Sequence, residues 1–383
     1  MVRMRSWRWL FRIACGVVLL CAAGCGKFFV PENGSGGGST GSSDYFYVGN
    51  QNTGTIAGFS VGTSKLTNTA NSPYSISVGL TPSAMAVTPG GKYVYVGSVA
   101  GGIFGFSVGT DGSLSMLNSG SALVSGVAPA VIGVDPTGGW LVEVDLGTTT
   151  TAPIAHVFAI DSGSGLLTPQ GNPLGLDVGS PNSIVFTPSN GLVYVSLGTG
   201  GVDVLTLNAS GVLTKLNQFL QPLGAQDADT GMAVDPAGKY LFIAETGSKG
   251  LRVLSIASTG ALTEVSGSPF QTGLGPTAVL VDSTGGFVYV TNRTDGTISA
   301  FTLASTGALT AITGSPFATG SQPSGLAEDT AHTHIGVANA GGSPDFQVFT
   351  IGSSTSTTPG GLTSFGKTTG TTASGAFAVV AAD

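Results

Sequence analysis

Seven copies of one unit of about 47 residues follow one another along this chain, and a repeat of that size constrains its architecture more than any other feature. The clearest copy runs from Thr284 to Asp329. When the copies are aligned on the centre of a recurring YVYV-like segment, these residues fall into register: Tyr47, Tyr95, Glu143, Tyr194, Phe242, Tyr289 and Gly336. The steps between them are 47 to 51 residues, so each unit is expected to be one structural module.

Each copy contains four short apolar runs separated by Gly, Pro, Asp, Ser and Thr. In the sixth copy the runs are Thr277–Asp282, Phe287–Asn292, Thr297–Leu303 and Leu309–Phe317. Runs this short, rich in β-branched and aromatic residues and bounded by turn residues, predict strands. Four antiparallel strands per repeat predict the blade of a β-propeller, which buries its two faces only against neighbouring blades. The chain is therefore expected to be all-β, with a seven-bladed β-propeller over residues 44–383.

The two ends of the repeat array are out of phase. The chain enters on a second-strand pattern at Asp44–Asn50 and leaves on a first-strand pattern at Gly375–Asp383. The predicted first strands are Ala84–Val87, Val131–Val134, Ser183–Phe186, Met232–Val234, Ala278–Val281, Ser324–Ala327 and Ala376–Val380. We expect Ala376–Val380 to pair with Tyr45–Gly49, because that pairing completes the blade begun by the N-terminal strand and leaves no open edge.

The first 43 residues have the composition of an address and a tether. Residues 1–24 contain a region with four arginines, followed by the apolar stretch Ile13–Ala23, which predicts an export signal. The segment Cys21–Cys25 resembles the lipobox of bacterial lipoproteins, which implies lipidation of Cys25; the alternative is an ordinary signal peptide cleaved nearby. Residues 25–43 are rich in Gly and Ser and predict a flexible tether. Because Gly26 is not Asp, the same resemblance favours the outer membrane within a bacterial cell envelope.

Charge and cysteine content exclude several classes of function. The chain has 13 basic and 20 acidic side chains, and four of the basic ones precede residue 25, so the remainder has a formal net charge of −11. Such an acidic protein is not expected to bind nucleic acid. The three cysteines are Cys15, Cys21 and Cys25, so the propeller has no thiol for a disulfide, a nucleophile or a zinc site.

A monomer is expected, with the membrane as a partner through the lipid, and an envelope protein, a glycan or a small molecule as the ligand.

Two segments of the sixth repeat, FVYVTN (Phe287–Asn292) and GTISAFTL (Gly296–Leu303), resemble the YVTN-repeat propellers. That group overlaps with the seven-bladed lactonase family named for 6-phosphogluconolactonase. The segment VDPTGGWLVEVDLG (Val134–Gly147) adds to the resemblance, which covers Asp44–Asp383. It implies a seven-bladed propeller and, for activity, a lactonase-type carboxylic ester hydrolase.

The chain departs from that family at the positions expected to carry the chemistry. The family has a Gly-Pro-Arg-His-like stretch before one first strand and His residues before another, where this chain has Gly275–Ala278 and Ala128–Ala130. Where the family often has Asn-Glu after a second strand, this chain has Asn292-Arg293. Opening a lactone needs a general base and donors for the developing oxyanion, and the familiar suppliers of both are absent.

The polar residues that remain near the expected ligand face, formed by the loops after second strands and before first strands, are the candidate site. Glu245 is the candidate general base or ligand contact, with a solvated loop charge as the alternative. The other ligand-face candidates are Asp145, Asn182, Asp227, Asp229, Asn292, Arg293 and Asn339.

No metal or cofactor is predicted, although two patterns leave metal binding open. Asp227–Gly231 resembles the start of a calcium loop but lacks its later carboxylates, so a capped turn is the alternative. His332 and His334 alternate on one strand and could share a face, although on the opposite rim. Glu143 is expected to face a neighbouring blade or to be partly exposed, and His156 stands alone on a third strand.

Two functions from different classes follow. The first is a lipid-anchored, extracytoplasmic binding or scaffolding propeller without catalysis. The alternative is a lactonase-type hydrolase that opens sugar lactones. The convergence of Glu245, Asp145, Asp227 or Asp229 at one mouth of the propeller would distinguish between them.

Overall fold

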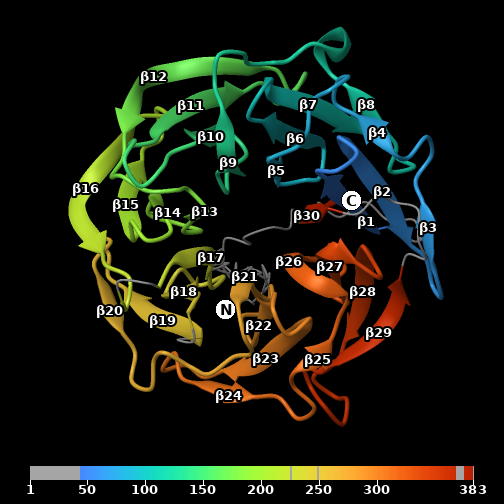
Figure 1. Ribbon diagram of the computed structural model, residues 1–383, viewed down its shortest axis with the longest axis vertical. Helices are drawn as coiled ribbons and strands as arrows, with labels where there is room; N and C mark the ends of the chain where they lie inside the picture. The colour runs from blue at the N-terminus through green and yellow to red at the C-terminus, as the bar shows by residue number, and fades with distance from the viewer. Residues whose placement is uncertain (1–43, 225–226, 248–249, 368–374, 383) are drawn as a thin grey trace, which may run out of the picture.

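Seven β-sheets surround a central axis in the computed structural model, which describes residues 44–224, 227–247, 250–367 and 375–382 (Figure 1). The predicted signal (1–24), Cys25 and the tether up to residue 43 lie outside the described residues. No α-helix occurs in the described ranges, where Asn118–Gly120 forms a 3-10 turn. Within those same ranges, no helix is long and apolar enough to cross a membrane. The predicted all-β, seven-bladed propeller is confirmed.

The strands have the following bounds: β1 (Asp44–Asn50), β2 (Thr55–Val61), β3 (Leu66–Asn68), β4 (Tyr74–Ser75), β5 (Ala84–Val87), β6 (Tyr93–Ser98), β7 (Gly102–Val108), β8 (Leu114–Met116), β9 (Pro129–Val134), β10 (Trp140–Asp145), β11 (Ile154–Ile160), β12 (Leu167–Gly175), β13 (Ser183–Phe186), β14 (Leu192–Ser196), β15 (Val202–Leu207), β16 (Leu213–Leu220), β17 (Asp229–Val234), β18 (Tyr240–Glu245), β19 (Gly250–Ile256), β20 (Leu262–Glu264), β21 (Pro276–Val281), β22 (Phe287–Asn292), β23 (Thr297–Leu303), β24 (Leu309–Ala311), β25 (Phe317–Ala318), β26 (Ser321–Glu328), β27 (His334–Gly342), β28 (Phe346–Ile351), β29 (Leu362–Lys367) and β30 (Ala376–Ala382).

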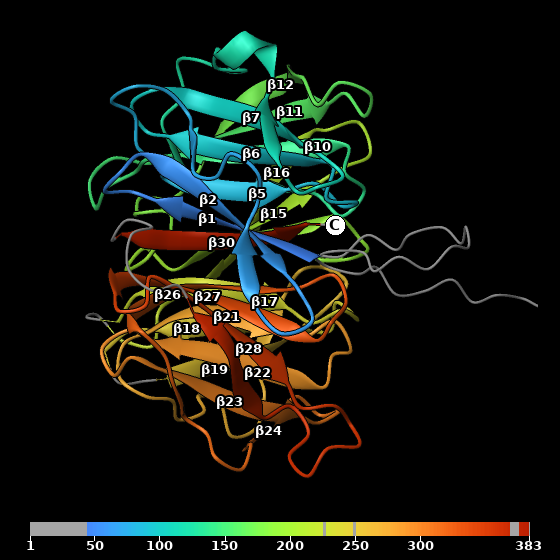
Figure 2. The same ribbon diagram turned by 90° about the vertical axis from the view of Figure 1, so that its right-hand side faces the viewer.

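Each blade is an antiparallel sheet whose first strand lies at the centre of the ring and whose fourth lies on its outer circumference (Figure 1). The short strands β4 and β25 add to two of the sheets by pairing with β2 and β23. In the closing blade the order is β3-β2-β1-β30, so the C-terminal strand supplies the innermost position. Tyr45 pairs with Ala382, and Asn50 with Ala376. The predicted pairing of the two chain ends is therefore confirmed, and Figure 2 shows β30 beside β1 in the side view.

A short polar side chain, Asp or Thr, stabilises the turn between the first and second strands in six of the blades. Asp135 accepts the backbone N–H of Trp140 at 2.7 Å, and Asp282 accepts that of Phe287 at 2.6 Å. A short side-chain acceptor satisfies backbone donors that a tight turn leaves unpaired, which explains the repeated Asp-x-x-Gly pattern. The same role falls to Thr88, Thr187, Asp235 and Asp329 in other blades.

Tyrosines of several second strands bind their blade to the next one. The hydroxyl of Tyr95 donates to the carbonyl of Gly165 in the following blade at 2.8 Å, and Tyr289 reaches Gly360 in the same way. Gly165 has φ +73°, and a Cβ there would meet the ring of Tyr93 at 2.6 Å. The glycine is needed both for the turn and for the close approach of the neighbouring ring. The apolar clusters likewise span neighbouring blades, so no blade has a core of its own.

Candidate functional site

The candidate residues lie on one rim because second strands end where first strands begin. Asp145 at the end of β10 is opposite Pro129, and Glu245 at the end of β18 is opposite Asp229. Antiparallel pairing therefore brings the two loop sets of the predicted ligand face together.

Two candidates on this rim, Asn292 and Asn339, are buried inside their own blades. The Asn292 side-chain amide donates to Thr297 Oγ1 and Ser299 Oγ, each at 2.9 Å. That of Asn339 donates to the carbonyl of Pro344 at 3.0 Å. Both side chains stabilise the hairpin between the second and third strands, which gives the repeated asparagine a structural role.

Polar side chains at the start of five first strands form a second set of interblade bonds, which we call the interblade clasps. Each donates to a backbone carbonyl near the equivalent position of the next blade. Thr277 donates to Pro323 O at 3.1 Å, and Asn182 donates to Asp229 O at 3.2 Å. The remaining members are Ser83, Thr230 and Ser324. Thr277, which stands where the family resemblance predicts an arginine, therefore joins two blades.

A cavity of about 350 Å³ at the centre of the ring is bounded by the first strands of all seven blades. Its wall is mainly apolar, with side chains such as Met85, Ile184 and Phe377. Its titratable lining residues within the described ranges are Asp135 and Glu328, both at the ends of first strands on the opposite rim. Glu328 accepts the N–H of Ser283 at 2.8 Å, and burial raises the pKa of its carboxyl. Neither is placed to act at the predicted ligand face.

The predicted base, Glu245, is fully buried and belongs to an ion cluster in the cleft that faces the preceding blade. Arg252 on β19 lies 2.9 Å from the Glu245 carboxylate, 2.7 Å from Glu264 and 3.7 Å from Asp229. The same guanidinium donates to Gln221 O, which follows the last strand of the preceding blade. Burial, together with the neighbouring Glu245 carboxylate, raises the pKa of Asp229 to about 8 despite the opposing effect of Arg252. Two predicted residues, Glu245 and Asp229, therefore do lie close together. Their side chains face Arg252 of the protein itself, and not a ligand site.

The blade before it carries a related cluster. The Lys215 ammonium lies 3.0 Å from Asp203 and 2.7 Å from Asp177, and Asp203 also accepts the N–H of Asp177 at 2.9 Å. Burial raises the pKa of Asp203, whereas the hydrogen bond from Lys215 lowers that of Asp177. A cation of the chain again neutralises a buried carboxylate, that of Asp203.

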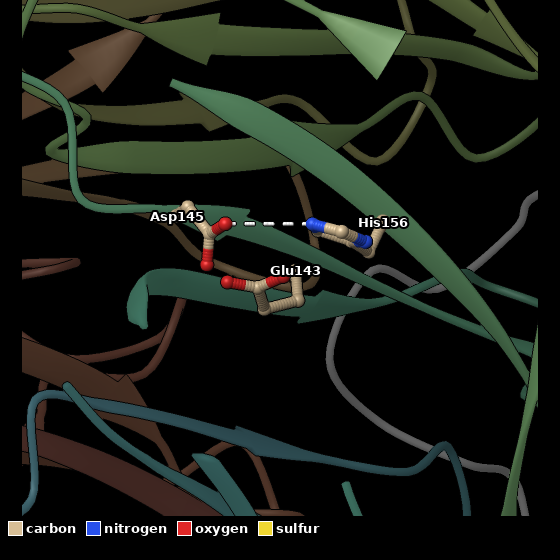
Figure 3. Close-up of side chains that lie close together, drawn as sticks. All are labelled: Glu143, Asp145 and His156. Atoms are coloured by element: carbon tan, nitrogen blue, oxygen red, sulfur yellow. Dashed lines mark ion pairs between the residues drawn. The ribbon is translucent and has the colours of Figure 1, made fainter. Parts of the chain in front are cut away.

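A third cluster, in the blade before that, joins Glu143, Asp145 and His156 (Figure 3). Asp145 Oδ2 lies 3.4 Å from His156 Nε2, and the other Asp145 oxygen accepts the N–H of Ala128 at 2.5 Å. Glu143 is completely buried, and neither carboxylate oxygen has a hydrogen-bond partner among the described residues. Burial, with a further contribution from Asp145, raises the pKa of Glu143 to about 10. Here no lysine or arginine forms an ion pair with the carboxylates in the part of the chain that the structure describes.

The strand register corrects the position assigned to Glu143 from the repeat. Val134 pairs with Leu141 as Val87 pairs with Val94, so Val142, and not Glu143, occupies the position of Tyr95. Successive residues of a strand point to opposite faces, so this shift of one residue reverses the direction of the side chain. Glu143 lies on the same face of β10 as Leu141, which packs with residues of the preceding blade.

His156, Asp203 and Arg252 occupy one position of the third strand in three consecutive blades, which was not predicted from the sequence. They pair with Glu143, Val195 and Ile243, which are equivalent residues of the second strands. A polar residue at the same place in successive repeats was the available signal. Its meaning depended on which second-strand residue lay opposite.

A polar cavity of about 580 Å³ lies between two adjacent blades on the predicted ligand face. It is lined by the loop between β22 and β23, by the end of the segment before β26 and by the first residues of β26: Arg293, Thr294, Asp295, Gly296, Thr319, Gly320, Ser321 and Gln322. Arg293 donates to the side-chain oxygen of Gln322 at 3.0 Å. Gln322 has φ +54°, a conformation that costs a non-glycine residue about 1–3 kcal/mol and is often found at functional sites. Of the predicted residues, Arg293 is the one placed in this cavity.

The remaining candidates do not join these groups. Asp227 is buried near the backbone of Gly224 and Gly247, whereas Asp229 turns toward Arg252. On the opposite rim, His332 lies 3.7 Å from Glu328, and His334 lies 2.7 Å from Asp329. The two histidines therefore pair with different carboxylates.

Comparisons with known proteins agree with this architecture. Residues 45–369 match the family model described as lactonase, 7-bladed beta-propeller. No curated protein matches the chain. A Bacteroides fragilis protein provisionally described as a 6-phosphogluconolactonase has a TM-score of 0.72 at 16% identity, over 91% of this chain and 100% of its own. A periplasmic gluconolactonase from Pseudomonas aeruginosa has a TM-score of 0.67 at 14% identity, over 89% and 99%. A Lactobacillus plantarum protein has a TM-score of 0.69 at 18% identity, over 89% and 100%. At these identities the structural likeness establishes the fold alone.

Proposed function

The chain belongs to the seven-bladed β-propeller lactonase family, and from that premise we propose that it is an extracytoplasmic binding propeller for a sugar-derived anion. The observation that carries the proposal is the polar cavity between the β22–β23 loop and the segment leading into β26. Fold alone does not assign an activity, so the proposal depends on the chemistry of this cavity.

The cavity offers the groups that a hydroxyl-rich anion requires. Arg293 presents a planar guanidinium, which binds carboxylate or phosphate through two parallel hydrogen bonds. Gln322 and the hydroxyls of Thr294 and Ser321 supply exposed donors and acceptors for sugar hydroxyls. The exposed carboxylate of Asp295 is oriented by the N–H of Leu274 at 2.7 Å and can accept from a further hydroxyl. The bond between Arg293 and Gln322 holds both side chains across the cavity before a ligand arrives.

Binding without hydrolysis is supported by the positions of the residues that were expected to be catalytic, because these residues are buried or bonded to other parts of the protein. Glu245 is buried against Arg252, so it has no access to a water molecule at the ligand face. Thr277 is part of the interblade clasps. The central cavity has no titratable lining residue at that rim among the described residues. A general base must lie within hydrogen-bond reach of the water it activates, and these placements work against that role.

We predict that Arg293→Ala weakens the binding of gluconate and 6-phosphogluconate by about tenfold to a hundredfold, because a charge-assisted hydrogen bond contributes about 1.5–3 kcal/mol. Arg293→Lys keeps the charge without the fork and should give an intermediate loss. Isothermal titration calorimetry measures both. Lys65→Ala is the matched control, because it removes an exposed cation from a different blade. Equal affinity in wild type and Arg293→Ala, or no binding of either sugar acid, would contradict the proposed site.

Sugar-lactone hydrolysis is the second candidate, which family membership favours. The same protein should be assayed with gluconolactone and a panel of other sugar lactones by acid release. We expect rates at the level of spontaneous hydrolysis. Turnover well above that level, abolished by Glu245→Gln in a protein that still unfolds cooperatively, would favour the enzyme over the binding module.

We also propose that the protein is held in the bacterial cell envelope through lipid on Cys25, with the outer membrane favoured. Cys25→Ser is expected to move the protein from the membrane fraction to the soluble fraction, because a Gly/Ser tether has no membrane affinity of its own. Fractionation and incorporation of labelled fatty acid measure the effect. Cys15→Ser is the matched control and should stay membrane-bound. Membrane association of Cys25→Ser would instead indicate an uncleaved signal or a protein partner.

A further inference from the structure

The three clusters in consecutive interblade clefts differ in one respect. Two of them pair a charge on the third strand with the opposite charge on the fourth. Arg252 pairs with Glu264, and Asp203 pairs with Lys215 with the signs reversed. Leu254 is opposite Glu264, Leu205 is opposite Lys215 and Phe158 is opposite Pro169, each two residues after the polar residue of its third strand. The blade with His156 thus has Pro169 where its neighbours have a charge.

Without a fourth-strand charge, the cleft that contains Glu143 has no cation from a side chain of the described residues. A fully buried polar group whose oxygens have no hydrogen-bond partner among the described residues is costly to keep in a folded protein. In the equivalent cleft around Glu245, the Arg252 guanidinium offsets that cost. The side chains of Glu143, Asp145 and His156 lie close together in this cleft (Figure 3).

The geometry of these three residues suits a metal ion. One ligand atom from each of Glu143, Asp145 and His156 lies within 4.8 Å of the other two. Metal–ligand bonds of about 2.0–2.2 Å place neighbouring ligand atoms about 2.8–3.6 Å apart, a spacing that Asp145 and His156 already have at 3.4 Å and that an inward movement of the Glu143 carboxylate would complete. The N–H of Ala128 orients Asp145 through its other oxygen, as an outer hydrogen bond commonly does for a ligating carboxylate. The side chains of Asp145 and His156 are each 22% exposed, which gives an ion a route from solvent to the buried Glu143.

We propose that Glu143, Asp145 and His156 form a binding site for a divalent transition-metal ion in the cleft facing the preceding blade. Two carboxylates and one imidazole favour Mn²⁺, Fe²⁺ or Zn²⁺ over Ca²⁺ and Mg²⁺, which prefer oxygen ligands alone. In this cleft the ion balances the buried carboxylates, as the Arg252 guanidinium does in the cleft around Glu245. It also links β10, which carries Glu143 and Asp145, to β11, which carries His156. Three protein ligands leave further coordination positions for water.

Manganese is the probe for the test. Mn²⁺ binds carboxylate and imidazole, binds the cysteine thiols of the full chain only weakly, and gives an electron paramagnetic resonance signal. We expect the metal-stripped full-length protein to bind one Mn²⁺ at this site, with weak spectral coupling to an imidazole nitrogen. Zn²⁺ should displace it at lower concentration than Ca²⁺ does. Bound Mn²⁺ should also raise the unfolding temperature, because it binds the folded state.

Glu143→Gln and His156→Gln should each weaken Mn²⁺ binding at least a hundredfold, and His156→Gln should also abolish the nitrogen coupling. His334→Gln is the matched control: it removes a histidine that also pairs with an aspartate, on the opposite rim, and should leave binding unchanged. His156 is partly exposed, so its variant is expected to fold even if Glu143→Gln does not. The proposal is overturned if the wild type binds no Mn²⁺ or Zn²⁺ at millimolar concentration, or if a folded His156→Gln binds Mn²⁺ as tightly as the wild type.

Discussion

Removing residues 374–383 is expected to destabilise the whole propeller, and not merely to fray one end. β30 is the innermost strand of the closing blade, and its loss leaves the inner edge of β1 unpaired from Tyr45 to Asn50. It also removes Ala376, Val379 and Ala381 from a cluster that contains Phe46 and Phe346. Each blade relies on both neighbours for burial, so the opening extends to the blades on either side.

The expected result for this truncation is a fall in the unfolding temperature of about 15 °C or more, or the loss of a cooperative transition. Differential scanning calorimetry and near-ultraviolet circular dichroism measure it. Removing Asp383 alone is the matched control, because that residue follows the end of β30. An unfolding temperature close to that of the wild type would show that ring closure contributes little to stability.

Arg252→Met is expected to lower the free energy of unfolding by about 3–5 kcal/mol, because it leaves buried carboxylates without their cation. Glu245 loses a contact of 2.9 Å, and Asp229 loses its nearest positive charge. Urea unfolding followed by fluorescence measures the change. Arg293→Met is the control: it removes an exposed arginine and should change stability by no more than about 0.5 kcal/mol.

The cost of Arg252→Met should depend on pH in a definite direction. The pKa of Asp229 in the folded protein is raised to about 8, above its value in the unfolded chain, so the folded state holds the proton more tightly. The stability that this proton contributes is complete at low pH and is lost as the pH rises through about 8. Without Arg252 the ionised form is still less favourable, so the destabilisation should be larger at pH 9 than at pH 6.

Adding Asp229→Asn and Glu245→Gln to Arg252→Met should recover much of the loss, since the triple variant buries neutral groups of similar shape. Recovery would show that uncompensated charge, and not lost packing, causes the effect. If the triple variant is no more stable than Arg252→Met, the arginine acts mainly through the volume that it fills and through its bond to Gln221 O.

The sequence by itself determined the architecture of this protein, because that information is local and repeated. Turn residues such as Asp282 and Gly285 occur at fixed distances from β-branched runs, and they recur from blade to blade. The pairing of the chain ends could also be predicted, since Asp44–Asn50 matches a second strand and Gly375–Asp383 matches a first strand. Edges of a sheet that would otherwise stay open fix that choice.

The candidate sites depended on the tertiary structure, because they form across strands and between blades. Glu143 and His156 meet only through the pairing of β10 with β11. The register also shows that the repeat alignment is one residue out at Glu143, whose side chain therefore lies on the opposite face of its strand from that of Tyr95. Glu245 had the sequence context of an accessible base, yet Arg252 on the adjacent strand makes it part of a buried ion cluster. The identity and spacing of residues in the chain specify each strand, whereas the charges that share a cleft are decided by register and by the stacking of neighbouring blades.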